Sequence, residues 1–256
     1  MKKDTVVLFV SHILNDKIVS RYHTLENETC SFADIFLLIQ KNGDENLNVP
    51  EGVNYYSFSV ESLNELDYNP ICESIVPGSN HFALLQFYRD YPLYDYYWNI
   101  EYDVCFSGKW SFFFDKFAFV EADLLSSHVQ IYPDYPEWVW WNTLEPQLLP
   151  IQQADYIKSF NPIYRITNRA LALIDSMQVN GFRGHHEVLI PTLLNHYNLK
   201  IVDFGGNGKF VLPGYEEQFY LSKPNKEGSN IGGTMSYRPV FESIGDVADK
   251  LYHPVK

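Results

Sequence analysis

The feature that most constrains the fold of this chain is a series of short apolar runs in its first half. Residues 5–10, 34–39 and 53–59 are rich in β-branched, aliphatic and aromatic side chains and show little polar alternation. Strands that are covered on both faces have such continuous runs, whereas a strand with one face in water alternates apolar and polar residues. The runs therefore predict strands of a mostly parallel sheet with helices on both faces.

Helical patterns separate the predicted strands. Residues 80–91 carry apolar side chains at near-helical spacing and stop at Pro92, so a helix is expected before the aromatic run that begins at Tyr96. This alternation predicts a doubly wound α/β fold related to the Rossmann fold. In the second half we expect, in order, a strand at 162–166, a helix capped by Thr167, a helix at 187–196, a strand at 199–203, a glycine turn at 205–208 and a long loop at 213–234.

Length and composition limit the class of protein. The 256 residues, 46% of them hydrophobic, are expected to form a single domain spanning 1–256. A formal net charge of -13 disfavours nucleic acid as a partner, because such a surface needs clustered Lys and Arg. No run approaches the roughly 20 apolar residues of a transmembrane segment, and three widely spaced cysteines suit a reducing compartment. We therefore expect a cytoplasmic protein.

Two carboxylates follow the aromatic run that begins at Tyr96. Glu101 and Asp103 are separated by one residue, so in an extended segment both project from the same face. Two adjacent acids repel each other unless a cation lies between them, and Mg²⁺ or Mn²⁺ prefers oxygen ligands. The carboxyl end of a buried strand is also where open α/β sheets bind ligands. A solvated strand end is the alternative for this common triplet, and the buried context favours a metal.

Three segments resemble, in the same order, the motifs of GT-A-type glycosyltransferases. They are residues 97–103, 184–192 and 251–256, and the chain looks like an uncharacterised bacterial and fungal branch of this nucleotide-diphospho-sugar transferase superfamily. The resemblance implies a GT-A-like fold, a nucleotide-diphospho-sugar donor, a sugar or glycan acceptor and a divalent metal cofactor, Mn²⁺ or Mg²⁺. It also implies that Asp103 binds the metal, that Glu101 contacts the metal or the donor, and that His253 is a further ligand. Glu101 departs from the aspartate usual at its position.

His185, His186 and Glu187 open a predicted helix. By the same resemblance Glu187 is the expected catalytic base or acceptor-binding carboxylate, with His186 as a secondary candidate. The alternative is that Glu187 only complements the helix dipole. Zinc hydrolysis is disfavoured, because consecutive residues on a helix diverge by about 100° and no H-E-x-x-H pattern is present.

The first strand is followed by polar residues that can face a nucleotide. Ser11 and His12 are candidates for contacts to the base or ribose, and Arg21 for a phosphate, with ordinary loop polarity as the alternative. The segment 132–141 contains three of the five tryptophans and is a candidate acceptor platform, although packing against the domain is the favoured explanation for any single ring. The sequence thus predicts a metal-dependent glycosyltransferase, with a catalytically silent sugar- or nucleotide-binding protein as the alternative.

Overall fold

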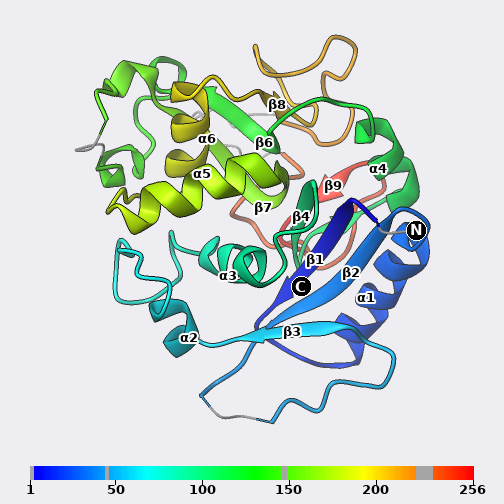
Figure 1. Cartoon of the computed structure of the whole chain (residues 1–256). Helices are drawn as coiled ribbons and strands as arrows, with labels where there is room; N and C mark the ends of the chain where they lie inside the picture. The colour runs from blue at the N-terminus through cyan, green and yellow to red at the C-terminus, as the bar shows by residue number, and fades with distance from the viewer. Residues whose placement is uncertain (1–2, 44–45, 146–148, 223–232) are drawn as a thin grey trace.

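The computed structural model describes residues 3–43, 46–145, 149–222 and 233–256. Its centre is a seven-stranded sheet with the order β3-β2-β1-β4-β7-β6-β8 (Figure 1). Only β7 runs against its neighbours; the pairs β1–β2, β1–β4, β2–β3 and β6–β8 are parallel. The strands of this sheet are β1 Thr5–Ser11, β2 Ala33–Gln40, β3 Tyr55–Phe58, β4 Tyr96–Glu101, β6 Leu124–Ile131, β7 Ile157–Thr167 and β8 Ile201–Asp203.

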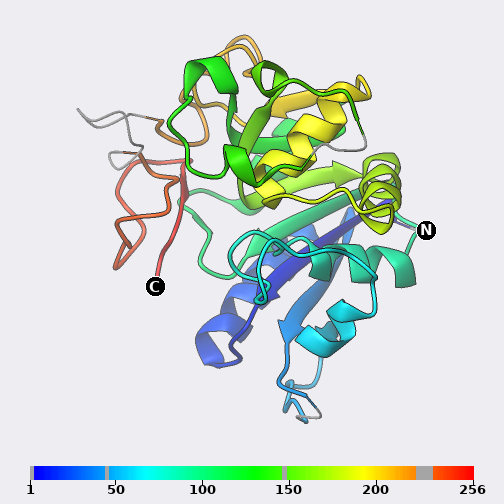
Figure 2. The same cartoon turned by 90° about the vertical axis from the view of Figure 1, so that its left-hand side faces the viewer.

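Helices cover both faces of the sheet, as two views at right angles show (Figures 1 and 2). Side chains of α1 and α4 pack into one apolar core, and side chains of α3, α5 and α6 pack into the other. The helices are α1 Asp16–Thr29, α2 Val60–Asn64, α3 Phe82–Asp90, α4 Trp110–Phe117, α5 Asn168–Val179 and α6 His186–His196, with short 3-10 helices at Tyr132–Asp134, Trp141–Thr143 and Gln153–Asp155.

The two cores explain the continuous apolar runs. In β1, Val7 and Phe9 pack with α1 and α4, whereas Val6 and Leu8 point into the opposite core, and all four side chains are buried. Successive residues of a strand point to opposite faces, so a strand between two cores has no position for a polar side chain. The predicted mostly parallel, doubly wound α/β architecture is confirmed.

Several elements, α1 and β6 among them, form where the sequence predicts no helix or strand. The sequence indicates a polar loop after the first strand, but this segment forms α1, which begins where the side chain of Asn15 accepts a hydrogen bond from Ile18 N. Strand β6 was not predicted, because Ser126, Ser127 and His128 interrupt its apolar pattern. Its pairing with β7 contains register shifts, and His128 has a φ of 48°, so the strand is irregular where it is polar.

A smaller two-stranded sheet lies beside the main one. Strand β9, Leu251–Tyr252, pairs antiparallel with β5, Cys105–Phe106, close after the end of β4. Of the predicted loop at 213–234, the described parts 213–222 and 233–234 form no helix or regular strand, and 223–232 lie outside the described residues. Within the described part of the chain, no helix has both the length and the apolar character needed to cross a membrane.

Candidate metal centre

The carboxylates of Glu101 and Asp103 lie at the carboxyl end of β4, which is an inner strand of the main sheet. The expectation that one extended strand carries both is wrong: β4 ends at Glu101, and residues 102–103 form a turn closed by a hydrogen bond from Val104 N to Glu101 O at 2.9 Å. The turn allows Val255 N to donate to Asp103 O at 2.8 Å. The end of β4 is thereby joined to the carboxyl-terminal segment.

That segment brings His253 to the two acids. His253 Nε2 lies 3.5 Å from Asp103 Oδ1 and 3.7 Å from Glu101 Oε2, and ligand atoms of all three residues lie within 4.8 Å of one another. His253 Nδ1 is 2.8 Å from the carbonyl oxygen of Ser236, so Nδ1 carries the donated proton and Nε2 faces the carboxylates. A backbone carbonyl that holds one ring nitrogen in this way is typical of metal-binding histidines.

The donor set fits a divalent cation. Two carboxylates and one imidazole nitrogen suit Mn²⁺, and Asp103 Oδ1 is buried yet accepts no hydrogen bond, which is unusual for a buried carboxylate oxygen. Asp103 and His253 are each less than 10% exposed, so water cannot fully solvate these charges. Among the described residues, this is the one group of three or more acidic, histidine or cysteine side chains close enough to share an ion.

Electrostatic shifts reflect the crowding of these groups. Burial lowers the pKa of His253, but the carboxylates of Asp103 and Glu101 outweigh it and raise the pKa to about 9. Burial raises the pKa of Asp103, but His253 and Lys256 lower it below its ordinary value. The Lys256 ammonium is 3.8 Å from Asp103 Oδ2 and half exposed. A protonated imidazole and a lysine thus supply the positive charge that a metal ion would otherwise provide.

Buried polar atoms without hydrogen-bond partners lie on residues that contact the candidate metal ligands or Glu187. Asn80 Nδ2 donates to Glu101 Oε1 at 3.5 Å, yet Asn80 Oδ1 is buried and unpaired. Ser236 Oγ and Asn161 Nδ2 are in the same condition, and both residues are over 90% buried. Unpaired buried polar atoms are rare and costly, and such atoms mark places where a ligand or water is bound.

Glu187 begins the first turn of α6, as predicted, and its side chain is 13% exposed. Its Oε1 accepts a hydrogen bond from Asn161 N at 3.2 Å, and its own backbone N donates to His185 Nδ1 at 3.3 Å. Burial raises the pKa of Glu187 to about 7, although Lys158 opposes the shift; Glu101 adds to it and His253 lessens it. The charges of the metal centre therefore act on Glu187.

Lys158 is a buried cation that sequence reasoning missed. It is 4% exposed, and its ammonium lies 5.3 Å from the ring centroid of Tyr135 and 5.4 Å from that of Trp138. Burial lowers the pKa of Lys158 to about 8 against the attraction of Glu187 and Asp203. No sequence signal pointed to this residue, since a single Lys in an apolar run normally marks an exposed strand position.

His186 lies in a group of three buried, neutral histidines. Its ring stacks on His81 at a centroid distance of 5.7 Å and lies 5.0 Å from the ring of His185. Burial lowers the pKa of His81 and of His185 to about 4, and it lowers the pKa of His186 well below its ordinary value. His81 Nε2 donates to Gln178 Oε1 at 2.8 Å, whereas Nδ1 of His81 and Nδ1 of His186 are buried without a hydrogen-bond partner.

The other residues predicted to contact the donor are Ser11, His12 and Arg21, and each makes a different kind of contact. His12 is exposed, and its ring packs edge-to-face against the ring of Tyr102 at a centroid distance of 5.0 Å. Tyr102 is the residue between Glu101 and Asp103 in the sequence. Ser11 is buried, and its hydroxyl donates to Ile13 O at 2.7 Å within its own turn. Arg21 lies inside α1, and its guanidinium donates to Tyr102 O at 2.6 Å.

A cavity of about 420 Å³ opens at the carboxyl ends of β1 and β2. It starts at His12 and the beginning of α1, and extends to the segment after β2. Its volume falls in the range of small-molecule sites, and its lining is largely polar, with several amides. The lining residues are His12, Leu14, Asn15, Asp16, Val19, Ile39, Gln40, Asn42, Asn46, Leu47, Asn48 and Pro50.

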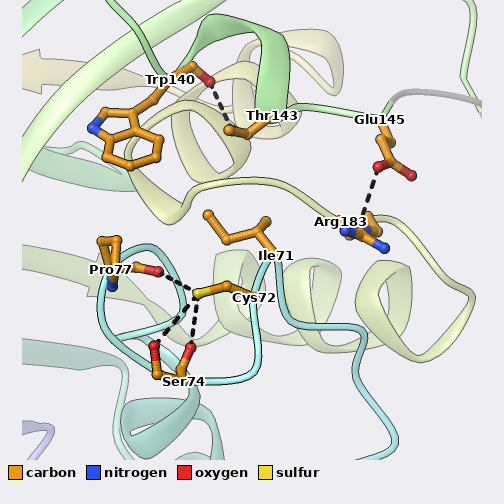
Figure 3. A pocket seen from close by; sticks show the side chains of 8 residues that line it. All are labelled: Ile71, Cys72, Ser74, Pro77, Trp140, Thr143, Glu145 and Arg183. Atoms are coloured by element: carbon orange, nitrogen blue, oxygen red, sulfur yellow. Dashed lines mark hydrogen bonds and ion pairs between the residues drawn. The ribbon is translucent and has the colours of Figure 1, made fainter.

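A second cavity, of about 450 Å³, lies near the amino-terminal end of α6 and is shown in Figure 3. Trp140, from the predicted aromatic platform, lines it and stacks on His185 at 4.7 Å, and Thr143 Oγ1 accepts from His185 N at 3.0 Å. Glu145 and Arg183 form an ion pair of 3.4 Å at its edge. The other lining residues are Ile71, Cys72, Ser74 and Pro77.

Comparisons with known proteins give a likeness of architecture only. No family model and no curated protein matches the chain. A Bacillus anthracis protein assigned as a glucose-1-phosphate thymidylyltransferase, solved in complex with sucrose, is 14% identical over 80% of this chain and 88% of its own, with a TM-score of 0.44. A mycobacterial protein is 16% identical over 77% of this chain and 62% of its own, also with a TM-score of 0.44. Neither likeness assigns an activity.

Proposed function

We propose that the chain is a metal-dependent glycosyltransferase that moves a sugar from a nucleotide-diphospho-sugar donor to a hydroxyl of a sugar or glycan acceptor. The observation that carries this proposal is the convergence of Glu101, Asp103 and His253 at the end of β4. The polar cavity at the ends of β1 and β2 supports it, because its lining includes His12, which packs against Tyr102 beside this centre. A nucleoside in that cavity would place its diphosphate toward the acids.

Asp103 and His253 would hold a Mn²⁺ or Mg²⁺ ion, and Glu101 would complete the ligands or contact the donor. A divalent ion bound there supplies positive charge that stabilises a departing nucleoside diphosphate. The protein's own part is to orient the ligands. The Ser236 carbonyl fixes the imidazole tautomer, and Asn80 donates to Glu101, so both side chains are held before the donor binds.

Glu187 is proposed to accept the proton of the acceptor hydroxyl. Its pKa of about 7 matches a base that works near neutral pH, and the hydrogen bond from Asn161 N holds one of its carboxylate oxygens. His186 is a weaker candidate for proton transfer, because burial keeps its ring neutral and its pKa far below neutral. It orients the start of α6 through His186 N, which donates to Gly78 O at 2.8 Å.

Release of nucleoside diphosphate tests this function. Nucleotide-sugars are incubated with Mn²⁺ and a panel of sugar and glycan acceptors, and the diphosphate released is measured. A glycosyltransferase releases it faster when its acceptor is present. Donor binding without release with any acceptor would identify a silent binding protein instead. Release that no acceptor accelerates would identify a hydrolase.

A further inference from the structure

Arg21 connects the two backbone segments that carry the candidate metal ligands. One guanidinium nitrogen donates to Tyr102 O at 2.6 Å, and both terminal nitrogens lie 3.5 Å from Val255 O. Tyr102 separates Glu101 from Asp103, and Val255 follows His253 by two residues. A single side chain on α1 therefore contacts chain positions 81 and 234 residues away from it, on either side of the centre.

The contact geometry favours a role in placement. A guanidinium is planar and presents several donors in a fixed fork, so it can hold two carbonyl oxygens at a set separation. The joined segments also meet through the hydrogen bond from Val255 N to Asp103 O, through the short β5–β9 pair, through hydrogen bonds between Ser107 and Lys250, and through the ion pair of Lys256 with Asp103. Hydrogen bonds from a charged donor are stronger than those between neutral groups, so these contacts weigh heavily in placing the short carboxyl-terminal segment.

We propose that Arg21 is a positioning residue that sets the separation of Asp103 and His253 and so the affinity of the centre for Mn²⁺. This inference rests on the proposed metal-dependent function. Arg21 touches neither ligand side chain, and the carbonyl oxygens of Tyr102 and Val255 transmit its effect through the backbone. Its role differs from a phosphate contact, which would act on the donor and leave binding of Mn²⁺ alone unchanged.

Removal of Arg21 has two effects on the affinity for Mn²⁺, one electrostatic and one through placement of the ligands, and they act in opposite directions. A cation beside a metal site repels the ion, so removal of the charge alone would strengthen Mn²⁺ binding. Removal of the fork loosens the ligands and weakens binding. Substitutions around metal ligands typically cost 10- to 100-fold in metal affinity. Arg21→Lys keeps the charge and loses the fork, whereas Arg21→Met loses both.

Arg165 provides a matched control. It also donates to backbone carbonyls, those of Phe117 and Val120 among them, and its guanidinium lies over the rings of Tyr96 and Trp98 on β4, but its hydrogen bonds join neither of the segments that carry Asp103 and His253. Arg165→Lys is expected to lower thermal stability and to leave Mn²⁺ affinity unchanged. The pair of variants separates a specific effect on the metal centre from general destabilisation.

The test combines Mn²⁺ calorimetry of the full chain with amide hydrogen exchange of the metal-free protein. Both Arg21 variants are expected to bind Mn²⁺ about tenfold more weakly and to exchange the Val255 amide faster, whereas Arg165→Lys does neither. Unchanged exchange at Val255 in Arg21→Lys overturns the positioning role, whether or not the protein binds metal. Unchanged Mn²⁺ affinity with weaker nucleoside diphosphate binding overturns it in favour of a phosphate contact. Failure of the unaltered protein to bind Mn²⁺, with exchange at Val255 still faster in the variant, refutes the metal-dependent function and limits Arg21 to holding the segment.

Discussion

Replacement of Glu187 by glutamine is expected to lower sugar transfer and, above pH 7, to stabilise the protein. Burial raises the pKa of Glu187 from 4.5 to about 7, so the folded state retains a proton that the unfolded state has released between these values. The free energy of unfolding therefore falls as pH rises through this window, and the whole loss is present above pH 7. The difference between 4.5 and about 7 sets an upper bound of roughly 3 kcal/mol on the stability lost when Glu187 ionises.

The glutamine amide keeps the shape of the side chain and carries no charge at any pH. Loss of the attraction to Lys158 reduces the gain, so we expect about 1–2 kcal/mol at pH 8.5, or roughly 2–8 °C in Tm, and almost none at pH 5. Thermal unfolding in excess chelator at both pH values measures this stabilisation, and Glu121→Gln, at an exposed position, serves as the control. A Tm difference from the unaltered protein that is equal at pH 5 and pH 8.5 would refute the buried-carboxylate reasoning. Unchanged transfer in Glu187→Gln would leave the residue only its place at the start of α6.

Two further predictions concern histidines. His253→Ala is expected to weaken Mn²⁺-dependent donor binding at least tenfold, whereas removal of the half-exposed Lys256 changes it little, as calorimetry with each variant will show; equal effects of the two changes would contradict the ligand assignment. Because burial lowers the pKa of His81 and of His185 from 6.5 to about 4, each ring contributes about 2 kcal/mol of stability at pH 7 that is lost as pH drops to 5, which is opposite in sign to the contribution of Glu187. Urea unfolding of the unaltered protein and of His81→Gln at the two pH values isolates the part due to His81, and a difference in unfolding free energy between the two proteins that is the same at pH 5 and pH 7 would contradict it.

The sheet could be predicted because the continuous apolar composition of β1 and β2 reflects their burial on both faces. In residues 5–10 and 34–39, apolar side chains occur on both faces of the expected strand, and each segment forms a strand that packs between the two cores. Strand β6 lacks this signal, since its polar residues are satisfied by distant partners: Val129 N donates to Asp203 Oδ2, and Ser126 Oγ donates to Asn161 Oδ1. Hydrogen bonds between residues far apart in sequence leave no periodic pattern.

The site could be predicted only in part for a related reason. The spacing of Glu101 and Asp103 is local and visible, although a turn and not a strand brings the acids together. The contact of Glu187 with Asn161 depends on the insertion of β7 between β4 and β6, which the sequence does not specify locally. Arg21 illustrates the same limit, because its carbonyl partners belong to distant segments.

The most direct test of the central claim is calorimetry of nucleoside diphosphate binding in Mn²⁺ and in excess chelator. The metal centre predicts binding in Mn²⁺ that chelator abolishes, and at least tenfold weaker binding in Asp103→Asn. Asp115→Asn, at an exposed position on α4, serves as the matched control and should bind like the unaltered protein. Equal affinity in Mn²⁺ and in chelator, or an Asp103→Asn variant that binds as tightly as Asp115→Asn, would contradict a metal-dependent donor site at the end of β4.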